Sequence, residues 1–206
     1  MGKMELRWLG HSCFVLEMDG YKVIFDPFTE GSVPGIPAIH EEVDLVLSSH
    51  SHGDHAGAAG VTLRKGKECP FAIEEIHSFH DECRGAKRGK NIIRVLSADG
   101  ISVAHMGDIG CEPTKEQKEK LKGVDVMLMP VGGFYTLEPK EVKALVEELK
   151  PRVLIPMHYR SSSFGFDTIG TLEDYLALCD DVVRYGGPTF TPEKDMPRQT
   201  AVLSLT

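Results

Sequence analysis

Four potential metal ligands stand within six positions in the segment HSHGDH, residues 50–55. The segment directly follows an apolar run that we expect to be a buried strand. In extended chain the side chains of His50 and His52 share a side, because side chains alternate with a period of two. The glycine that follows lets Asp54 and His55 turn toward a second point. This geometry favours two metal ions side by side over one.

Further potential ligands follow later strands, since His80, Asp108 and His158 each close a run that we predict to be a strand. In an α/β fold the carboxyl ends of such strands meet at one edge, which brings these side chains to the place of residues 50–55. A His-rich turn that is only polar surface is the alternative, and the recurrence downstream argues against it. Imidazole and carboxylate ligands suit zinc and also manganese or iron, and a catalytic site keeps one position open for water.

Short strands dominate the first half of the chain and alternate with helices in the second. We predict strands over Glu5–Leu9, Cys13–Met18, Lys22–Phe25, Val43–Ser48, Phe71–Ile76, Ile92–Leu96, Ile101–Ala104, Val124–Met129, Val153–Pro156 and Ala201–Ser204. We predict helices over Lys115–Lys122, Glu138–Lys150 and Leu172–Cys179. The Pro- and Gly-rich segment Pro27–His40 is predicted to be a loop. This order favours stacked sheets flanked by helices, in one α/β domain over residues 1–206.

Composition excludes several classes of protein. The 206 residues carry 23 Lys and Arg against 31 Asp and Glu, a formal net charge of −8, which argues against a nucleic-acid-binding protein with a broad basic face. The five cysteines are odd in number, scattered and without a C-x-x-C pair, which indicates reduced thiols and a cytoplasmic protein. No apolar run approaches the ~20 residues that span a bilayer, so we expect no membrane insertion.

The sequence resembles the metallo-β-lactamase superfamily, whose H-x-H-x-D-H motif is matched in full by residues 50–55. The resemblance extends along nearly the whole chain, through Trp8–Ser12, Phe25–Pro27, Gly107–Asp108, Pro130–Gly133 and His158–Tyr159. Among subfamilies it is most similar to compact zinc-dependent hydrolases that group with L-ascorbate-6-phosphate lactonase and, more distantly, N-acylphosphatidylethanolamine phospholipase D. The resemblance implies a four-layer αββα sandwich of the metallo-β-lactamase type.

The resemblance also implies a ligand set for two divalent ions, zinc first, with manganese or iron as alternatives. The ligands of the first ion would be His50, His52 and His80, those of the second Asp54, His55 and His158, and Asp108 would bridge both. His77 lies three residues before His80 and competes with it, although the family places this ligand just after the strand. Members that reduce oxygen or nitric oxide carry Glu at the position of His52, so a histidine there favours hydrolysis over redox chemistry.

The expected activity is a hydrolase in which a metal-bridging hydroxide attacks an ester, lactone or phosphodiester of a small anionic substrate. Asp54 is the expected catalytic residue, which orients the nucleophile and shuttles its proton, against pure metal ligation as its alternative role. Two other functions remain open. A nuclease-type phosphodiesterase of the same superfamily is one, although such members resemble longer chains with an added RNA-binding arm or second domain. A metal-stabilised binding protein without turnover is the other, and the complete ligand set argues against it.

Several residues have a candidate role beside the ligands. Asp26 resembles the carboxylate that fixes a ligand imidazole, with a strand-ending Asp-Pro turn as the alternative. His11 and His105 fit buried hydrogen-bonded histidines, or a role behind the ligands or toward substrate. The loop Arg84–Asn91 holds four basic residues, and its Lys87 and Arg88 are candidates to bind an anionic substrate, against a solvated hairpin loop.

Overall fold

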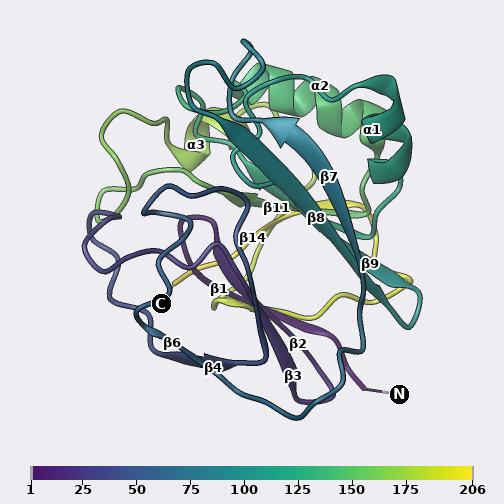
Figure 1. Ribbon diagram of the computed structural model, residues 1–206. Coiled ribbons are helices and arrows are strands. Elements are labelled where there is room, and N and C mark those ends of the chain that lie inside the picture. The colour runs from purple at the N-terminus through teal and green to yellow at the C-terminus, as the bar shows by residue number, and fades with distance from the viewer. Residues whose placement is uncertain (1, 206) are drawn as a thin grey trace.

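Two stacked β-sheets form the centre of the computed structural model, which describes residues 2–205 (Figure 1). The five-stranded sheet has the order β13-β1-β2-β3-β5. Its strands are β1 (Glu5–Gly10), β2 (Cys13–Met18), β3 (Tyr21–Phe25), β5 (Leu45–Leu47) and β13 (Thr189–Phe190). β1, β2 and β3 form an antiparallel meander, and β5 joins β3 in parallel.

The seven-stranded sheet has the order β12-β14-β11-β10-β9-β8-β7. Its strands are β7 (Ala72–Phe79), β8 (Lys90–Ala98), β9 (Ile101–His105), β10 (Val126–Pro130), β11 (Val153–Met157), β12 (Val182–Arg184) and β14 (Gln199–Val202). β7, β8 and β9 pair in antiparallel fashion, whereas β9, β10, β11, β14 and β12 are parallel neighbours. The parallel strands therefore end at one common edge of the sheet. A small sheet pairs β4 (Glu41–Val43) with β6 (Val61–Leu63).

Three helices cover the outer face of the seven-stranded sheet, above the strands in Figure 1. They are α1 (Lys115–Leu121), α2 (Pro139–Leu149) and α3 (Leu172–Leu176). α2 forms because Pro139 suits a first turn and because four apolar residues at helical spacing all face the core: Val142, Leu145, Val146 and Leu149. α1 and α3 each begin with a capping box, in which Thr114 and Thr171 accept from the backbone three residues on.

A second hydrophobic cluster lies on the other face of the five-stranded sheet. Strand alternation sends Phe14 and Leu16 into the main core between the sheets and turns Cys13 and Val15 to the opposite face. That face is covered by residues of the Pro- and Gly-rich segment, namely Phe28, Val33, Ile36 and Ile39. Within residues 2–205 the first helix is α1, so the outer layer here is an irregular segment with the β4-β6 sheet. The expected α/β arrangement of stacked sheets flanked by helices is confirmed, with this non-helical layer as its particular feature.

The predicted strand Val43–Ser48 is wrong as a single element, because the chain changes sheets at Asp44. The N–H of Asp44 donates to the Lys22 carbonyl at 2.8 Å, and the Asp44 carboxylate accepts from the Lys22 N–H and pairs with Arg64. β4 and β5 therefore lie on either side of this residue, in different sheets. A hydrophobic run does not reveal such a break, since its cause is a contact with residues far along the chain.

Other boundaries differ where pairing or local turns decide them. β7 and β8 run further than predicted, because their antiparallel register continues from Ala72 opposite Ser97 to Phe79 opposite Lys90. α3 ends before Cys179, since Leu178 and Cys179 donate to carbonyls three residues back in tighter turns. β6, β12 and β13 were not expected, and each has only two or three residues.

The hairpin loop between β7 and β8 is organised by Asp81, whose side chain is buried. Its carboxylate accepts backbone N–H groups from Cys83 at 2.8 Å, Gly85 at 2.9 Å, Lys87 at 3.0 Å and Arg88 at 2.7 Å. Burial by itself raises the pKa of this carboxyl, but the four N–H donors outweigh it and lower the pKa to about 2. Sequence reasoning identified the basic loop but not the acidic residue that shapes it.

All five cysteines are free thiols. Among residues 2–205, none of the helices combines the length and the apolar character that crossing a membrane requires.

We expect Ile36→Ala to lower the free energy of unfolding by about 2–5 kcal/mol, because Ile36 is buried in the cluster under the five-stranded sheet. Ile73→Ala is the matched control, since Ile73 is 39% exposed on an edge strand, and we expect it to stay within about 0.5 kcal/mol of wild type. Urea unfolding followed by circular dichroism measures both. Equal, small effects would mean that the segment does not pack as a layer.

We expect Asp81→Asn to unfold at a lower urea concentration than wild type at pH 6. The folded-state pKa of Asp81 lies below its ordinary value of 3.8, so its contribution is complete above pH 4 and is lost as pH falls through about 2. The gap between the two proteins should therefore shrink over that range, measured with chelator present. The control Glu82→Gln changes an exposed neighbour and should match wild type. A gap that stays constant down to pH 2 would contradict this role.

Candidate metal centre

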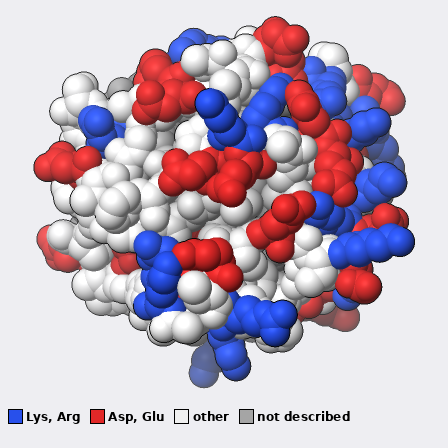
Figure 2. All heavy atoms as spheres, turned by 90° about the horizontal axis from the view of Figure 1, so that it is seen from above, with Lys and Arg blue, Asp and Glu red and all other residues white. Residues whose placement is uncertain are grey.

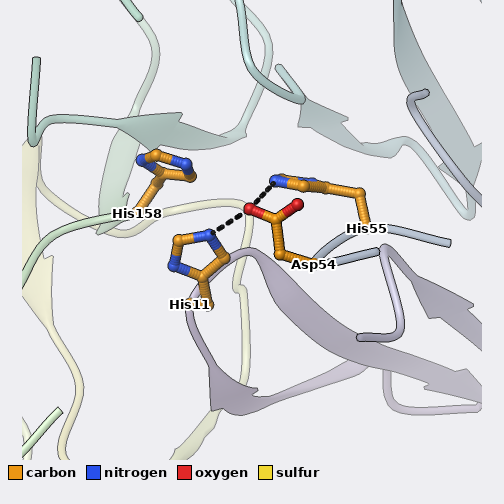
Figure 3. Close-up of side chains that lie close together, drawn as sticks. All are labelled: His11, Asp54, His55 and His158. Atoms are coloured by element: carbon orange, nitrogen blue, oxygen red, sulfur yellow. Dashed lines mark ion pairs between the residues drawn. The ribbon is translucent and has the colours of Figure 1, made fainter. Parts of the chain in front are cut away.

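Histidine and aspartate side chains from both sheets converge in three overlapping groups. In each group the ligand atoms lie within 4.8 Å of one another: His11 with Asp54, His55 and His158; His50 with His52 and His80; and His50 with His55 and Asp108. The structure thus brings together all seven expected ligands and adds His11. Figure 3 shows the first group, in which three imidazoles surround the carboxylate of Asp54.

Strand ends position these side chains. Residues 50–55 come shortly after β5, His80 directly follows β7, and His158 directly follows β11. Asp108 stands three residues after the end of β9 at His105, and His11 stands in the turn between β1 and β2. The convergence follows from the topology, because the ends of both sheets meet at this edge (Figure 1).

The backbone around the cluster is held in unusual conformations. His11 has φ 50° and His158 has φ 53°, in the left-handed region that costs a non-glycine residue roughly 1–2 kcal/mol. The N–H of His158 donates to the carbonyl of His11 at 3.3 Å, and that carbonyl also accepts from the Trp8 indole at 3.0 Å. Strain of this kind gathers at functional sites.

Gly107 meets both a conformational and a space requirement before Asp108. Its φ is 57°, and a Cβ there would stand 2.2 Å from the Asn91 side-chain oxygen. That oxygen accepts the backbone N–H of Asp108 at 3.0 Å, while the amide of Asn91 donates to the Met106 carbonyl at 2.9 Å. The glycine therefore lets Asn91 fix the backbone of Asp108.

Distances between donor atoms match those of metal ligands. Oδ2 of Asp108 lies 3.2 Å from Nε2 of His55, 3.3 Å from that of His80 and 3.1 Å from that of His158. Two ligands held ~2.0–2.1 Å from a tetrahedral ion stand about 3.3–3.4 Å apart. The spacing therefore fits side chains that face a common cation.

Several of these atoms are buried without a hydrogen-bond partner among the described residues. They are Nε2 of His11, His50 and His55 and Oδ1 of Asp108. A buried polar atom that lacks a partner costs about 1–3 kcal/mol, so a cluster of them calls for a ligand. Imidazole nitrogens and carboxylates are donors that zinc, manganese and iron accept, and the residues present therefore fit a divalent metal.

The opposite ring nitrogens of three histidines are anchored by protein groups. His55 donates from Nδ1 to Asp26 at 2.7 Å, and His80 donates to the Tyr135 carbonyl at 3.1 Å. His50 donates to the hydroxyl of Ser49 at 2.9 Å, and this hydroxyl in turn donates to Asp26 at 2.7 Å. Such anchors fix the tautomer, so that each Nε2 lone pair faces the cluster. The role of Asp26 goes beyond ending a strand, because its carboxylate accepts hydrogen bonds from both Ser49 and His55.

The electrostatics favour the metal-binding protonation states of His50, His11 and Asp108, whereas those of His55 favour its protonated form. Burial lowers the pKa of His50 to about 3 and that of His11 to about 4, so both imidazoles are neutral near pH 7. Burial raises the pKa of Asp108, but His158 and His55 outweigh it and hold that pKa well below its usual range. Burial likewise opposes the proton on His55, and the carboxylates of Asp108 and Asp26 raise its pKa. A cation at this point would displace that proton.

Three histidines lie outside the cluster, and of these His40 is exposed. His105 is buried, bonds through Nε2 to the Ser12 carbonyl at 2.8 Å and stacks on Phe25 with ring centroids 5.0 Å apart. It is a packed core histidine. His77 is exposed on the edge strand β7, so the structure brings His80, and not His77, to the ligand groups.

The two basic candidates of the β7–β8 loop have different surroundings. Lys87 is exposed and pairs with Glu82. Arg88 lies over the ring of Tyr135, 5.6 Å from its centroid, and donates to the Phe134 carbonyl at 3.3 Å. Arg88 therefore contacts Phe134, the residue directly before Tyr135, whose carbonyl anchors His80. On the face seen in Figure 2, basic and acidic side chains are interspersed.

The comparisons agree with this geometry. Residues 5–158 match the family described as the beta-lactamase superfamily domain. A UPF0173 metal-dependent hydrolase of Archaeoglobus fulgidus is 31% identical over 198 residues, which cover 77% of this chain and 84% of the relative. A relative from Methanopyrus kandleri with the same description is 31% identical over 193 residues, covering 76% of this chain and 84% of its own.

Solved structures are similar over nearly the full length. A structure from Thermotoga maritima, described as a candidate Zn-dependent hydrolase of the metallo-β-lactamase superfamily, has a TM-score of 0.72 at 32% identity and covers 97% of both chains. Igni18, a metallo hydrolase of Ignicoccus hospitalis, has a TM-score of 0.66 at 23% identity, covering 93% of this chain and 99% of its own, which shows a shared fold. The chain belongs to the β-lactamase superfamily domain family and is a metal-dependent hydrolase with the metallo-β-lactamase fold.

Proposed function

We propose that the protein is a dinuclear, zinc-dependent hydrolase that cleaves an ester, lactone or phosphodiester bond of a small anionic substrate. The observation that carries this proposal is the spacing of 3.1–3.3 Å between Asp108 and imidazoles of two different groups. One carboxylate oxygen that faces both groups supports a bridging role for Asp108 between two ions.

The ligand groups of the candidate metal centre support an assignment of ligands to the two ions. The first position would be held by His50, His52 and His80, and the second by Asp54, His55 and His158. His80 faces Asp108 from the first set, and His55 and His158 face it from the second. This arrangement supports two ions that share Asp108, rather than one ion at the centre.

Two such ions supply a hydroxide nucleophile at neutral pH and polarise the bond that is attacked. The chain's own residues orient the reaction. Asp54 has a side chain 20% exposed between buried histidines, so its carboxylate reaches both the cluster and solvent. Burial raises its pKa, but His11 and His55 outweigh this and keep the carboxyl ionised. An ionised Asp54 accepts a hydrogen bond from the attacking water and thereby orients it.

Charge and relatives support the substrate and metal classes. Two divalent ions outweigh the carboxylates of the cluster, which favours an anionic substrate even in a protein of net charge −8. The same net charge argues for a small molecule over a nucleic acid. The Zn-dependent description of the Thermotoga maritima structure supports zinc. Resemblance to ascorbate-6-phosphate lactonase makes phosphorylated lactones a first substrate class to test.

Two further expectations extend the proposal to the whole protein. The match of the Thermotoga maritima structure to 97% of the chain supports a single domain over residues 1–206. The five free thiols support a reducing, cytoplasmic location.

We expect Asp108→Ala to remove metal from both positions and to abolish hydrolysis, because this carboxylate faces both ligand groups. Elemental analysis should show metal content fall from two ions per chain toward zero, and chromogenic phosphodiesters, lactones and thioesters report turnover. Asp180→Ala is the matched control, since Asp180 is exposed. Full metal content and activity in Asp108→Ala would refute the assignment. Bound metal without turnover on any substrate in wild type would favour a binding protein.

We expect Arg88→Ala to raise KM for a chromogenic phosphodiester about tenfold, the loss of a charged hydrogen bond worth ~1.5 kcal/mol, with little change in kcat. Lys87→Ala is the matched control from the same loop, because the charge of Lys87 is already paired with Glu82. Steady-state kinetics measure both. An unchanged KM in both variants would mean that the loop is a solvated hairpin without contact to substrate.

A further inference from the structure

The second metal position has one donor more than the seven-ligand assignment uses. The imidazole of His11 is fully buried, and its Nε2 lies 3.4 Å from Oδ2 of Asp54. Its ring is 4.1 Å from that of His158, centroid to centroid. In Figure 3 it faces Asp54 from the side opposite His55.

We propose that Nε2 of His11 is a further protein ligand of the second metal position, beside Asp54, His55, His158 and the shared Asp108. This ligand makes the second position the tighter of the two and leaves the first as the exchangeable one. The inference rests on the proposed function, because it assumes that both positions bind a divalent cation.

Geometry favours ligation over a hydrogen bond between His11 and Asp54. N–H···O bonds have donor–acceptor distances of about 2.7–3.2 Å, and both ring nitrogens of His11 lack a hydrogen-bond partner among the described residues. A separation of 3.4 Å instead matches the ~3.3–3.4 Å between two ligands of a tetrahedral ion. Nε2 of His55 stands at the equivalent distance of 3.5 Å from the same oxygen. Asp54 therefore has two imidazoles at ligand spacing.

The two metal positions differ in the number of protein donors and in exposure to solvent. Beside the shared Asp108, the second would have the four donors of His11, Asp54, His55 and His158, three of them buried. The first has the three donors of His50, His52 and His80, and His52 is exposed to solvent. With one donor fewer than the second position and with access to solvent, the first position exchanges its ion more readily.

The backbone holds His11 ready for this role. The backbone of His11 is left-handed, and its carbonyl accepts hydrogen bonds from the Trp8 indole and the His158 N–H. These contacts fix the position of the His11 Cα, from which the side chain extends. Because this ordering is completed on folding, a cation meets a preformed donor and the binding step carries less entropic cost.

The test is metal binding to the full chain, with Zn²⁺ titrated in competition with a chromophoric chelator and with Co²⁺ followed by its visible absorption. We expect wild type to bind two Zn²⁺ in two steps of different affinity. His11→Ala should weaken the tight step at least tenfold and reduce the Co²⁺ absorption of the ion that binds first, while the weaker step stays in place. His77→Ala removes an exposed histidine outside the cluster and should match wild type.

A second variant separates ligation from folding. His11→Asn keeps a residue that tolerates positive φ, so its metal-free form should unfold close to wild type while the tight step is still weakened. If wild type binds two ions and both variants bind them with unchanged affinity and spectrum, His11 is not a ligand and the inference is overturned. If wild type itself binds no metal, the proposed function fails together with the inference.

Discussion

The structure depends on one buried carboxylate that faces three imidazoles. Asp108 is nearly inaccessible, and its Oδ2 stands 3.1–3.3 Å from Nε2 of His55, His80 and His158, which lie in segments that follow separate strands. Burial of an anion raises the free energy of the folded state unless cations or hydrogen bonds compensate the charge. The Asp108 carboxylate therefore requires positive charge beside it, at the edge where the sheets meet. The unpartnered ring nitrogens around it also need an electron-pair acceptor, and a divalent ion meets both requirements at once.

The rest of the fold supplies the rigidity that this arrangement requires. Parallel strands bring His158 and Asp108 to one edge, while Asn91 and Asp26 hold the backbone and rings behind the ligands. The five-stranded sheet contributes His11 and residues 50–55 from the ends of its strands, and an irregular apolar segment covers its outer face. His11 and His158 keep their strained left-handed backbone conformations because the surrounding core fixes both residues in place.

Sequence reasoning located what depends on local pattern. The HSHGDH segment and the strands before Asp108 and His158 could be predicted, since hydrophobic runs and ligand spacing are visible in the chain. The proximity of His11 to Asp54 could not, because it depends on a left-handed turn and on contacts between distant segments; a Gly-His pair between two predicted strands was its only signal. The strand break at Asp44 and the role of Asp81 in the β7–β8 loop were missed for the same reason. Both depend on hydrogen bonds that the hydrophobic periodicity of the sequence does not reveal.

The most direct test is a crystal structure of the zinc-reconstituted protein with anomalous scattering recorded at the zinc edge. The account predicts two peaks ~3.5–4 Å apart, with Asp108 at ligand distance from both. One peak should be bound by His50, His52 and His80, and the other by His11, Asp54, His55 and His158. A single peak, or peaks that do not contact Asp108, would contradict the dinuclear centre.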